Sequence, residues 1–327
     1  MVRPWTPALR VEVNSVDVTE RLSANLISFS YNDYEKDDSD SLSFTLVNSP
    51  TFALPSRGDP VAAWLGWKEK GLRFLGRFTV DEISVALASG GSPATMTISA
   101  KTVDFSKGRE KVKKSRQWEK ISLSDMLGKI AAEHGCGAKV LGASVFYPSV
   151  AQSKESDLHL LRRLCAEAGL RFVIKDRTFV VFAPGTDLRG TAKLAASEVT
   201  TGTFTFADRG KYGAVVAKWW DPEKAAEQTI KTGAGSPIYT IRKPFQSSAQ
   251  AQTAAQNHLA VLQRGEIEGN LTLQGREDIF AGTIITLVGF APSIINGEYI
   301  ATNCNHSVSK SSGFSTTLKL ETIPKRN

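Results

Sequence analysis

Residues 151–169, AQSKESDLHLLRRLCAEAG, contain the side-chain types that hydrolytic enzymes use. Two serines, two carboxylates and a histidine lie within residues 153–159, directly before an apolar segment. A serine nucleophile needs a histidine base within hydrogen-bond reach and a carboxylate that orients this base. The same residue types also begin helices, so the spacing must decide between a catalytic cluster and a helix start.

The spacing favours a helix start. Ser156 directly precedes a set of residues spaced i, i+3, i+7 and i+10, which is one face of a helix: Leu158, Leu161, Cys165 and Ala168. A serine at this point accepts a backbone N–H as an N-cap, and Gly169 is a typical C-terminal stop.

The charged neighbours fit the same interpretation. Glu155 and Asp157 lie at the positive end of the helix dipole, where carboxylates are stabilising. His159 falls in the first turn. A capping hydroxyl points into the helix terminus, and the glycines of a nucleophile elbow are missing. We therefore predict a cap and no catalytic residue.

Other sites for chemistry are not predicted either. His134 and Cys136 form an H-x-C pair, but no second pair follows at zinc spacing. The segment 37–40 lacks the glycine and distal glutamate of an EF-hand, and no glycine-rich phosphate loop is present. We expect no metal and no cofactor.

The elements around this helix read as strands at both ends of the chain. Leu42, Phe44 and Leu46 alternate with polar residues, and similar period-two segments recur up to residue 100. Ser122 is a predicted N-cap for a second helix, and residues 172–182 read as a hairpin. Strands return after residue 190, with one helix near 248–264. The predicted fold is α+β and β-rich, with two similar antiparallel β-barrel domains (1–105 and 191–327) and a small α/β domain (106–190) between them.

The two strand-rich ends also share a spacing. Successive gaps are 8, 10, 2 and 20 residues in the first set and 7, 8, 2 and 19 in the second. The first set is Gly58, Gly66, Gly76, Phe78 and Ile98, and the second is Gly282, Gly289, Gly297, Tyr299 and Leu318. Two related β domains are predicted from this internal repeat.

Charge is distributed in blocks. The chain has 327 residues and a net charge of +7, with seven basic and two acidic residues in 107–120 and five carboxylates in 31–40. Separated blocks of opposite sign suit subunit contacts. The candidate interface residues are Asp37, Asp38, Asp40, Lys111, Lys113 and Lys114.

Compartment and membrane behaviour follow from composition. Three cysteines form no disulfide framework, which suits a reducing compartment such as the cytoplasm. No run of 18 apolar residues exists, so we expect no membrane insertion.

The opening segment also supports a resemblance. Gln152, Ser153, Glu155, Ser156, Asp157, Leu158, Leu161 and Gly169 form a pattern that resembles a signature of the phage late control D proteins. These proteins are central hubs of contractile-tail baseplates, related to the hub portion of valine-glycine repeat proteins of type VI secretion. That family usually has an aromatic residue where this chain has Leu160. Shorter matches occur at Asp40-x-Leu42-x-Phe44, Gly76-x-Phe78-x-Val80 and Gly313-Phe314-x-Thr316.

The resemblance implies a homotrimer that adapts a six-fold tail tube to a three-fold spike. Its partners would be the tail tube protein, a spike formed by a separate chain and other baseplate proteins, with DNA or the tape-measure protein passing through the lumen. The chain would be assembled in the cytoplasm of a bacterial host and end up in the tail of a virion or a phage-tail-like particle. The sequence does not distinguish an infectious phage from a headless bacteriocin as the particle that contains this chain.

Two other functions compete with this interpretation. A tail-associated peptidoglycan hydrolase would need a paired acid and base, which the sequence does not show. A DNA-binding late regulator would need a recognition helix with several basic residues, and the helix after Ser156 carries only Arg162 and Arg163.

Overall fold

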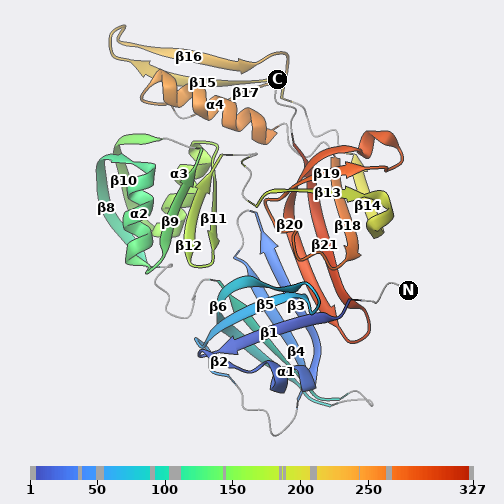
Figure 1. Cartoon of the computed structure of the whole chain (residues 1–327). Helices are drawn as coiled ribbons and strands as arrows, with labels where there is room; N and C mark the ends of the chain where they lie inside the picture. Colours follow the sequence, from blue (N-terminus) through green and yellow to red (C-terminus); the bar gives the residue numbers. More distant parts are fainter. Residues whose placement is uncertain are drawn as a thin grey trace.

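Two β-sheets, one from each end of the chain, are joined edge to edge in the computed structural model (Figure 1). The structure describes residues 5–35, 39–48, 55–88, 93–102, 112–142, 145–183, 186, 189–206, 212–242, 244–262 and 267–323. A small α/β domain and a second small sheet lie beside the joined sheets.

The first sheet has the strand order β2-β1-β5-β6-β7-β4-β3, with all neighbours antiparallel. Its strands alternate buried and exposed residues, because one face covers a core built around Phe29, Leu42, Leu65 and Phe78. Its elements are β1 (Pro7–Val13), β2 (Val16–Asp17), α1 (Thr19–Asn25), β3 (Leu26–Tyr34), β4 (Ser41–Val47), β5 (Pro60–Trp67), β6 (Gly71–Ala86) and β7 (Thr95–Lys101).

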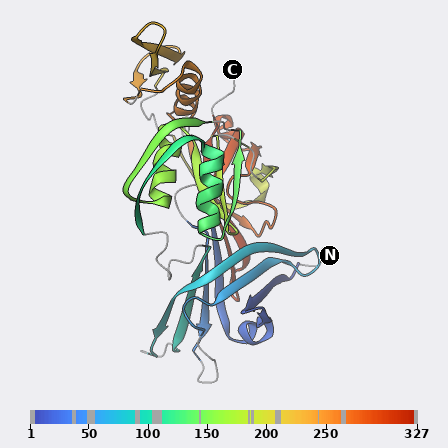
Figure 2. The same ribbon diagram turned by 90° about the vertical axis from the view of Figure 1, so that its left-hand side faces the viewer.

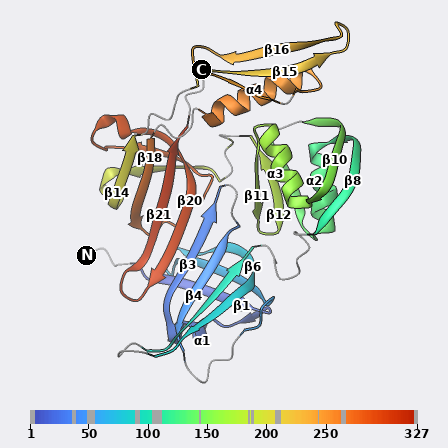
Figure 3. The same cartoon turned by 180° about the vertical axis from the view of Figure 1, so that it is seen from behind.

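The second sheet has the order β13-β19-β20-β21-β18-β14 and a core of its own. The two sheets meet where β3 pairs with the C-terminal half of β20 (Figure 3). The elements are β13 (Thr191–Ala195), η3 (Ala196–Glu198), β14 (Val199–Phe206), β18 (Ile267–Gln274), β19 (Ile284–Val288), η4 (Ser293–Ile295), β20 (Gly297–Ser309) and β21 (Gly313–Thr322).

The two sheets share one strand order when their strands are matched in the order in which they occur along the chain. β3, β4, β7, β6 and β5 correspond to β14, β18, β21, β20 and β19. Backbone irregularities agree as well: β6 has a bulge between Val80 and Glu82 against β7, and β20 has one between Ala301 and Asn303 against β21. The internal repeat predicted from the spacing is therefore a repeat of structure.

Side chains repeat at the same places. Thr45 and Thr97 bring their hydroxyls to 3.5 Å in the first sheet, and Thr272 and Thr317 do so at 3.1 Å in the second. The edge-to-face pair of Tyr31 with Phe78 corresponds to Phe204 with Tyr299, with ring centroids 6.0 and 6.3 Å apart.

Two of the predicted glycine pairs have matching conformations. Gly58 and Gly282 have φ of 90° and 88°, and Gly76 and Gly297 have φ of 140° and 150°. Residues with a Cβ rarely adopt this region, so glycine recurs at equivalent positions of the two sheets.

The α/β domain faces the viewer in Figure 2. A two-stranded sheet of β8 and β10 and a three-stranded sheet of β9, β12 and β11 enclose two helices and share one core. The predicted hairpin is confirmed, with Val173 opposite Val180. The elements are β8 (Lys113–Ser122), α2 (Leu123–Glu133), β9 (Gly137–Leu141), β10 (Phe146–Ser156), α3 (Asp157–Glu167), β11 (Arg171–Lys175) and β12 (Thr178–Phe182).

The structure differs from the sequence-based prediction at residues 214–262, which that prediction assigns to the second β domain. They form a separate three-stranded sheet with its own core, inserted between β14 and β18 (Figure 1). Three alanines of the helix, Ala251, Ala254 and Ala255, pack closely on this sheet and share its core with Val215 and Ala217. The elements are β15 (Ala214–Asp221), β16 (Ala226–Gly233), β17 (Ile238–Thr240) and α4 (Ser248–Leu262).

In the described part of the chain, the helices are too short or too polar to cross a membrane.

Candidate functional site

The signature segment spans the end of β10 and the start of α3. Ser156 caps α3, because its hydroxyl accepts the backbone N–H of His159 at 3.3 Å. Ser122 caps α2 in the same way, accepting the N–H of Asp125 at 3.0 Å. Both predicted caps are confirmed.

Asp157 lies in a network that the sequence did not predict. It is the first residue of α3, and its carboxylate is buried. Lys114 Nζ lies 2.6 Å from Oδ2, and Arg116 Nη2 lies 2.6 Å from Oδ1. Gln152 donates to Oδ1 at 2.9 Å, and His134 Nε2 lies 3.0 Å from Oδ2. This carboxylate therefore joins α3 to β8, β10 and the end of α2.

The charges in this network are matched. Burial acts to raise the pKa of Asp157, but hydrogen bonds from Lys114, Gln152 and His134 outweigh it and lower the pKa to about 2. The hydrogen bond from Arg116 lowers the pKa of Glu133. Neither carboxylate is tuned for proton transfer near neutral pH, so the network acts as a structural clamp.

Of the other signature residues, Gln152 also belongs to this clamp, and the rest lie outside it. Gln152 is buried and accepts from Arg116 Nε at 2.8 Å. Glu155 pairs with Arg163. Leu158 and Leu161 are buried in the domain core, whereas Ser153 is exposed.

Gly169 serves two purposes. It has φ of 66°, which suits glycine after a helix, and a Cβ here would lie 2.6 Å from the Cβ of Asn257 in α4. Asn257 also donates to the carbonyl of Ala168 at 3.1 Å, and His258 Nε2 lies 3.3 Å from the carbonyl of Glu167. The end of α3 is therefore completed by α4.

The residues that suggested catalysis are not arranged for it. His159 is 69% exposed, and its Nδ1 lies 3.4 Å from Glu155. The Ser156 hydroxyl is used by the cap, on the backbone of the same histidine. Arg163, one of the two basic residues that a DNA-reading helix would use, pairs with Glu155 and Glu167.

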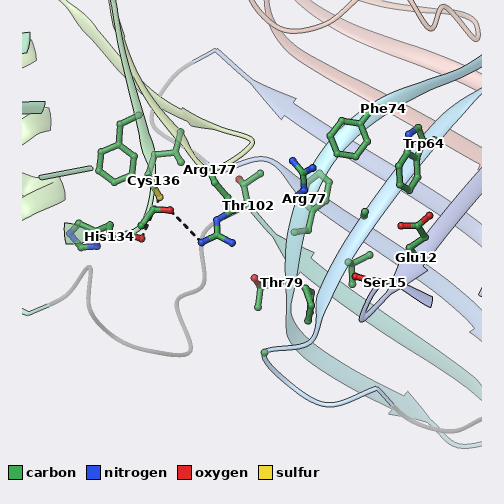
Figure 4. Close-up of a pocket in the computed structure, with 18 of the residues that line it drawn as sticks. Glu12, Ser15, Trp64, Phe74, Arg77, Thr79, Thr102, His134, Cys136 and Arg177 are labelled. Carbon is green, nitrogen blue, oxygen red and sulfur yellow. Dashed lines mark hydrogen bonds between the residues drawn. The ribbon is translucent and has the colours of Figure 1, made fainter. Parts of the chain in front are cut away.

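A cleft of about 780 Å³ lies between the first sheet and the α/β domain (Figure 4). It contains the His134 and Cys136 pair. Burial raises the pKa of the Cys136 thiol, which keeps it protonated, and His134 is held by Asp157. Arg177 donates to the carbonyl of Gly135 at 3.4 Å. The described lining residues thus present no activated nucleophile.

Lys175 forms a second buried ion cluster at the junction of the domains. It contacts Asp33 of β3 and lies 2.6 Å from Asp40. Asp33 also accepts the backbone N–H of Ala281 at 2.8 Å, so the cluster reaches the second sheet. Burial, with the nearby charge of Asp33, raises the pKa of Asp40 to about 7 against the lowering effect of Lys175. Burial also acts to raise the pKa of Asp33, but Lys175 lowers it overall.

This cluster corrects one interface assignment. Asp40 is 2% exposed and pairs within its own chain, so it cannot face a neighbouring subunit. Lys114 likewise is engaged by Asp157 and Glu133. Lys113 is exposed at the start of β8. Asp37, Asp38 and Lys111 lie outside the described residues.

Comparison with known proteins identifies the family to which this chain belongs. A model of the family described as phage tail baseplate hub (GPD) matches residues 96–312, more than half of the chain. The chain belongs to this family. The match includes the whole signature segment and its clamp.

Relatives of this hub support the assignment along nearly its full length. A probable baseplate hub protein of Escherichia phage 186 is 28% identical over 366 positions, covering 96% of this chain and 92% of the relative. The corresponding protein of Escherichia phage P2 is 27% identical, covering 97% and 93%. The hub is therefore a structural component of a phage tail.

Solved structures share the fold at low sequence identity. The 43 kDa tail protein of prophage MuSo2 from Shewanella oneidensis superposes with a TM-score of 0.71 at 11% identity, covering 96% of this chain and 98% of that one. A tail protein from Neisseria meningitidis MC58 gives 0.71 at 12%, covering 97% of both. The E. coli c3393 protein, a component of the type VI secretion system, gives 0.58 at 13%, covering 98% and 77%.

Proposed function

We propose that this hub is a homotrimer that adapts a six-fold tail tube to a three-fold spike. The observation that carries the proposal is the structural repeat. Two sheets with the same strand order, bulges and cross-strand pairs lie in one chain, so three chains present six similar units. A ring of three such chains has true three-fold symmetry, and its six similar sheets can match a six-fold partner on one side.

We propose a division of the chain that serves this role. Residues 1–105 and 191–327 hold the two repeated units, and residues 106–190 form the α/β domain. The inserted sheet at 214–262 docks on the end of α3 through Asn257 and His258. The proposed partners are the tail tube protein, the spike and other baseplate proteins, with DNA or the tape-measure protein in the lumen. Lys113 is a candidate contact to a partner.

We also propose that the hub has no catalytic activity of its own. The hydroxyl of Ser156 accepts a backbone N–H as a helix cap, and the buried carboxylate of Asp157 is paired with Lys114 and Arg116. The proposal covers phage particles and headless particles alike, since both require the same adaptor.

Light scattering on the full chain, alone and with its spike, tests the assembly. Three copies of the 35.4 kDa chain are expected. A chain that stays monomeric with the spike present, or a stable dimer, would contradict the adaptor. Cell-wall zymograms should stay blank, and a lytic band from the isolated chain would support the hydrolase instead.

A further inference from the structure

The seam between the two sheets within one chain has a definite register. β3 runs antiparallel to residues 303–309 of β20, with Tyr31 opposite His306 and Asp33 opposite Cys304. The rings of Tyr31 and His306 stack with centroids 6.0 Å apart. All four side chains are buried.

The repeat supplies a second copy of each strand of this seam. β14 is the counterpart of β3, since the pairing shift between Leu26 and Ser28 against β4 recurs between Val199 and Thr201 against β18. The C-terminal half of β6 is the counterpart of the C-terminal half of β20, because their bulges coincide.

Neither counterpart has its seam partner in the described structure. β14 pairs with β18 on one side alone. β6 pairs with β5 only up to Thr79, so residues 81–86 leave one edge without a strand, where β20 has β3. The two edges lie on opposite sides of the joined sheets (Figures 1 and 3).

These free edges expose apolar side chains at the positions that the seam buries. Val85 corresponds to His306 and is 45% exposed, against 1% for the histidine. Phe206 corresponds to Asp33 and is 52% exposed, against 0% for the carboxylate. Exposed apolar residues on an unpaired strand edge favour association with another strand.

We propose that β14 of one copy pairs antiparallel with residues 81–86 of β6 in the next copy. The in-chain seam sets the register: Ile83 opposite Phe206, Ser84 opposite Thr205, and Val85 opposite Phe204. This inference rests on the proposed homotrimer and names the surface that forms it.

The chemistry of the pairs suits the contact. Ile83 and Val85 would each meet an aromatic ring, and β-branched residues paired with aromatic residues stabilise antiparallel sheets. Ser84 would face Thr205 where the in-chain seam has the hydrogen-bonded pair Asn305 and Asn32, 2.8 Å apart. Each copy offers two different edges, β14 and residues 81–86 of β6, so the contact is head-to-tail, and such a contact forms a ring when its rotation closes.

A cysteine pair tests the register. Opposite residues of an antiparallel pair have Cα atoms about 4.5–5.5 Å apart, within the range that a disulfide bridges. The double variant Ser84→Cys/Thr205→Cys of the full chain, assembled with its spike and oxidised, should give covalent dimers and trimers on a non-reducing gel. Matched controls are each single variant, the unmodified chain with its three cysteines, and Ser84→Cys/Thr203→Cys, which is displaced by two residues.

The outcomes distinguish a failure of the proposed strand pairing from a failure of the proposed trimer. Trimers by light scattering without cross-links in the double variant would overturn the seam and leave the trimer standing. Cross-linked species that extend beyond three copies would support the seam and contradict the closed trimer. Monomers in every preparation would overturn both.

Charge substitutions give a second measurement that does not require oxidation. Val85→Glu and Phe206→Glu should each weaken self-association at least tenfold, with an unchanged circular dichroism spectrum, because both side chains are exposed in the single chain. Val16→Glu in β2, at a position that is 62% exposed and belongs to neither of these two edges, is the control and should assemble normally. Normal assembly of both seam variants would contradict the proposal.

Discussion

Lys175 and Asp40 form an ion pair of 2.6 Å that joins the α/β domain to the first sheet. The lysine lies at the end of β11, and it also contacts Asp33 at the edge where the two sheets meet. One ammonium group thus contacts two buried carboxylates of the first sheet. A buried charge without a partner is strongly destabilising, so this contact sets how the domains are held.

Replacing this lysine should loosen the domain junction. Lys175→Met removes the ammonium group that both Asp33 and Asp40 contact, and we expect a loss of about 3–5 kcal/mol in the free energy of unfolding. Urea denaturation measures the loss, and limited proteolysis should cut between the domains. Lys139→Met, on the exposed surface of β9, is the control and should be neutral. Equal stability of the two variants would show that the cluster is dispensable.

The core face of α3 should be sensitive to charge and its outer face should not. Leu161 is fully buried, so Leu161→Asp should cost several kcal/mol and unfold the α/β domain. His159→Ala, on the exposed face, should change stability little. Thermal unfolding of both variants checks this. Loss of particle function in His159→Ala with an intact fold would contradict the structural interpretation of the segment.

The cap on α3 should have a modest and measurable effect. Ser156→Ala removes the acceptor for the N–H of His159, and we expect a loss of about 1 kcal/mol. Ser153→Ala, an exposed serine three residues earlier, is the matched control. Chemical denaturation separates the two, and an unchanged midpoint in Ser156→Ala would argue against the cap.

Acid should destabilise the second sheet through His306. Burial lowers the pKa of this histidine from 6.5 to about 4. Between pH 6.5 and pH 4 the unfolded chain binds a proton at His306 that the folded chain does not. The contribution of His306 to stability therefore falls as the pH falls, by about 3 kcal/mol in total, and does not change above pH 6.5.

The variant His306→Gln isolates this effect. Glutamine can still donate to the carbonyl of Ile279 and accept from Thr316, which His306 contacts at 3.0 Å each. The unfolding free energy of the variant should depend less on pH across this window than that of the unmodified chain. Asp40 acts in the opposite direction, because its raised pKa makes stability fall as pH rises from about 4 to about 7. The informative quantity is therefore the difference in pH dependence between His306→Gln and the unmodified chain. Identical pH profiles of the two proteins would show that His306 is not the source of the acid sensitivity.

Features that depend on a few neighbouring residues were determined by the sequence itself. The caps at Ser122 and Ser156, the helix end at Gly169 and the alternation in β4 follow from local backbone geometry and from side-chain period. The repeat was also visible, because glycines mark positions where the backbone must adopt φ values that other residues avoid. The signature segment identified the family for the same reason, since its residues are close in sequence.

Only the tertiary structure decided which distant groups meet. Asp40 looked like part of a solvated acidic block, but its partner Lys175 lies 135 residues away, and nothing local to either residue indicates the contact. Asp157 looked like a helix-dipole carboxylate, yet β8 brings Lys114 and Arg116 onto it. The inserted sheet at 214–262 was likewise hidden, because strand period does not say which sheet a strand joins. Such pairings depend on which edges and faces come together once the whole chain has folded, and this is the information that the local pattern lacks.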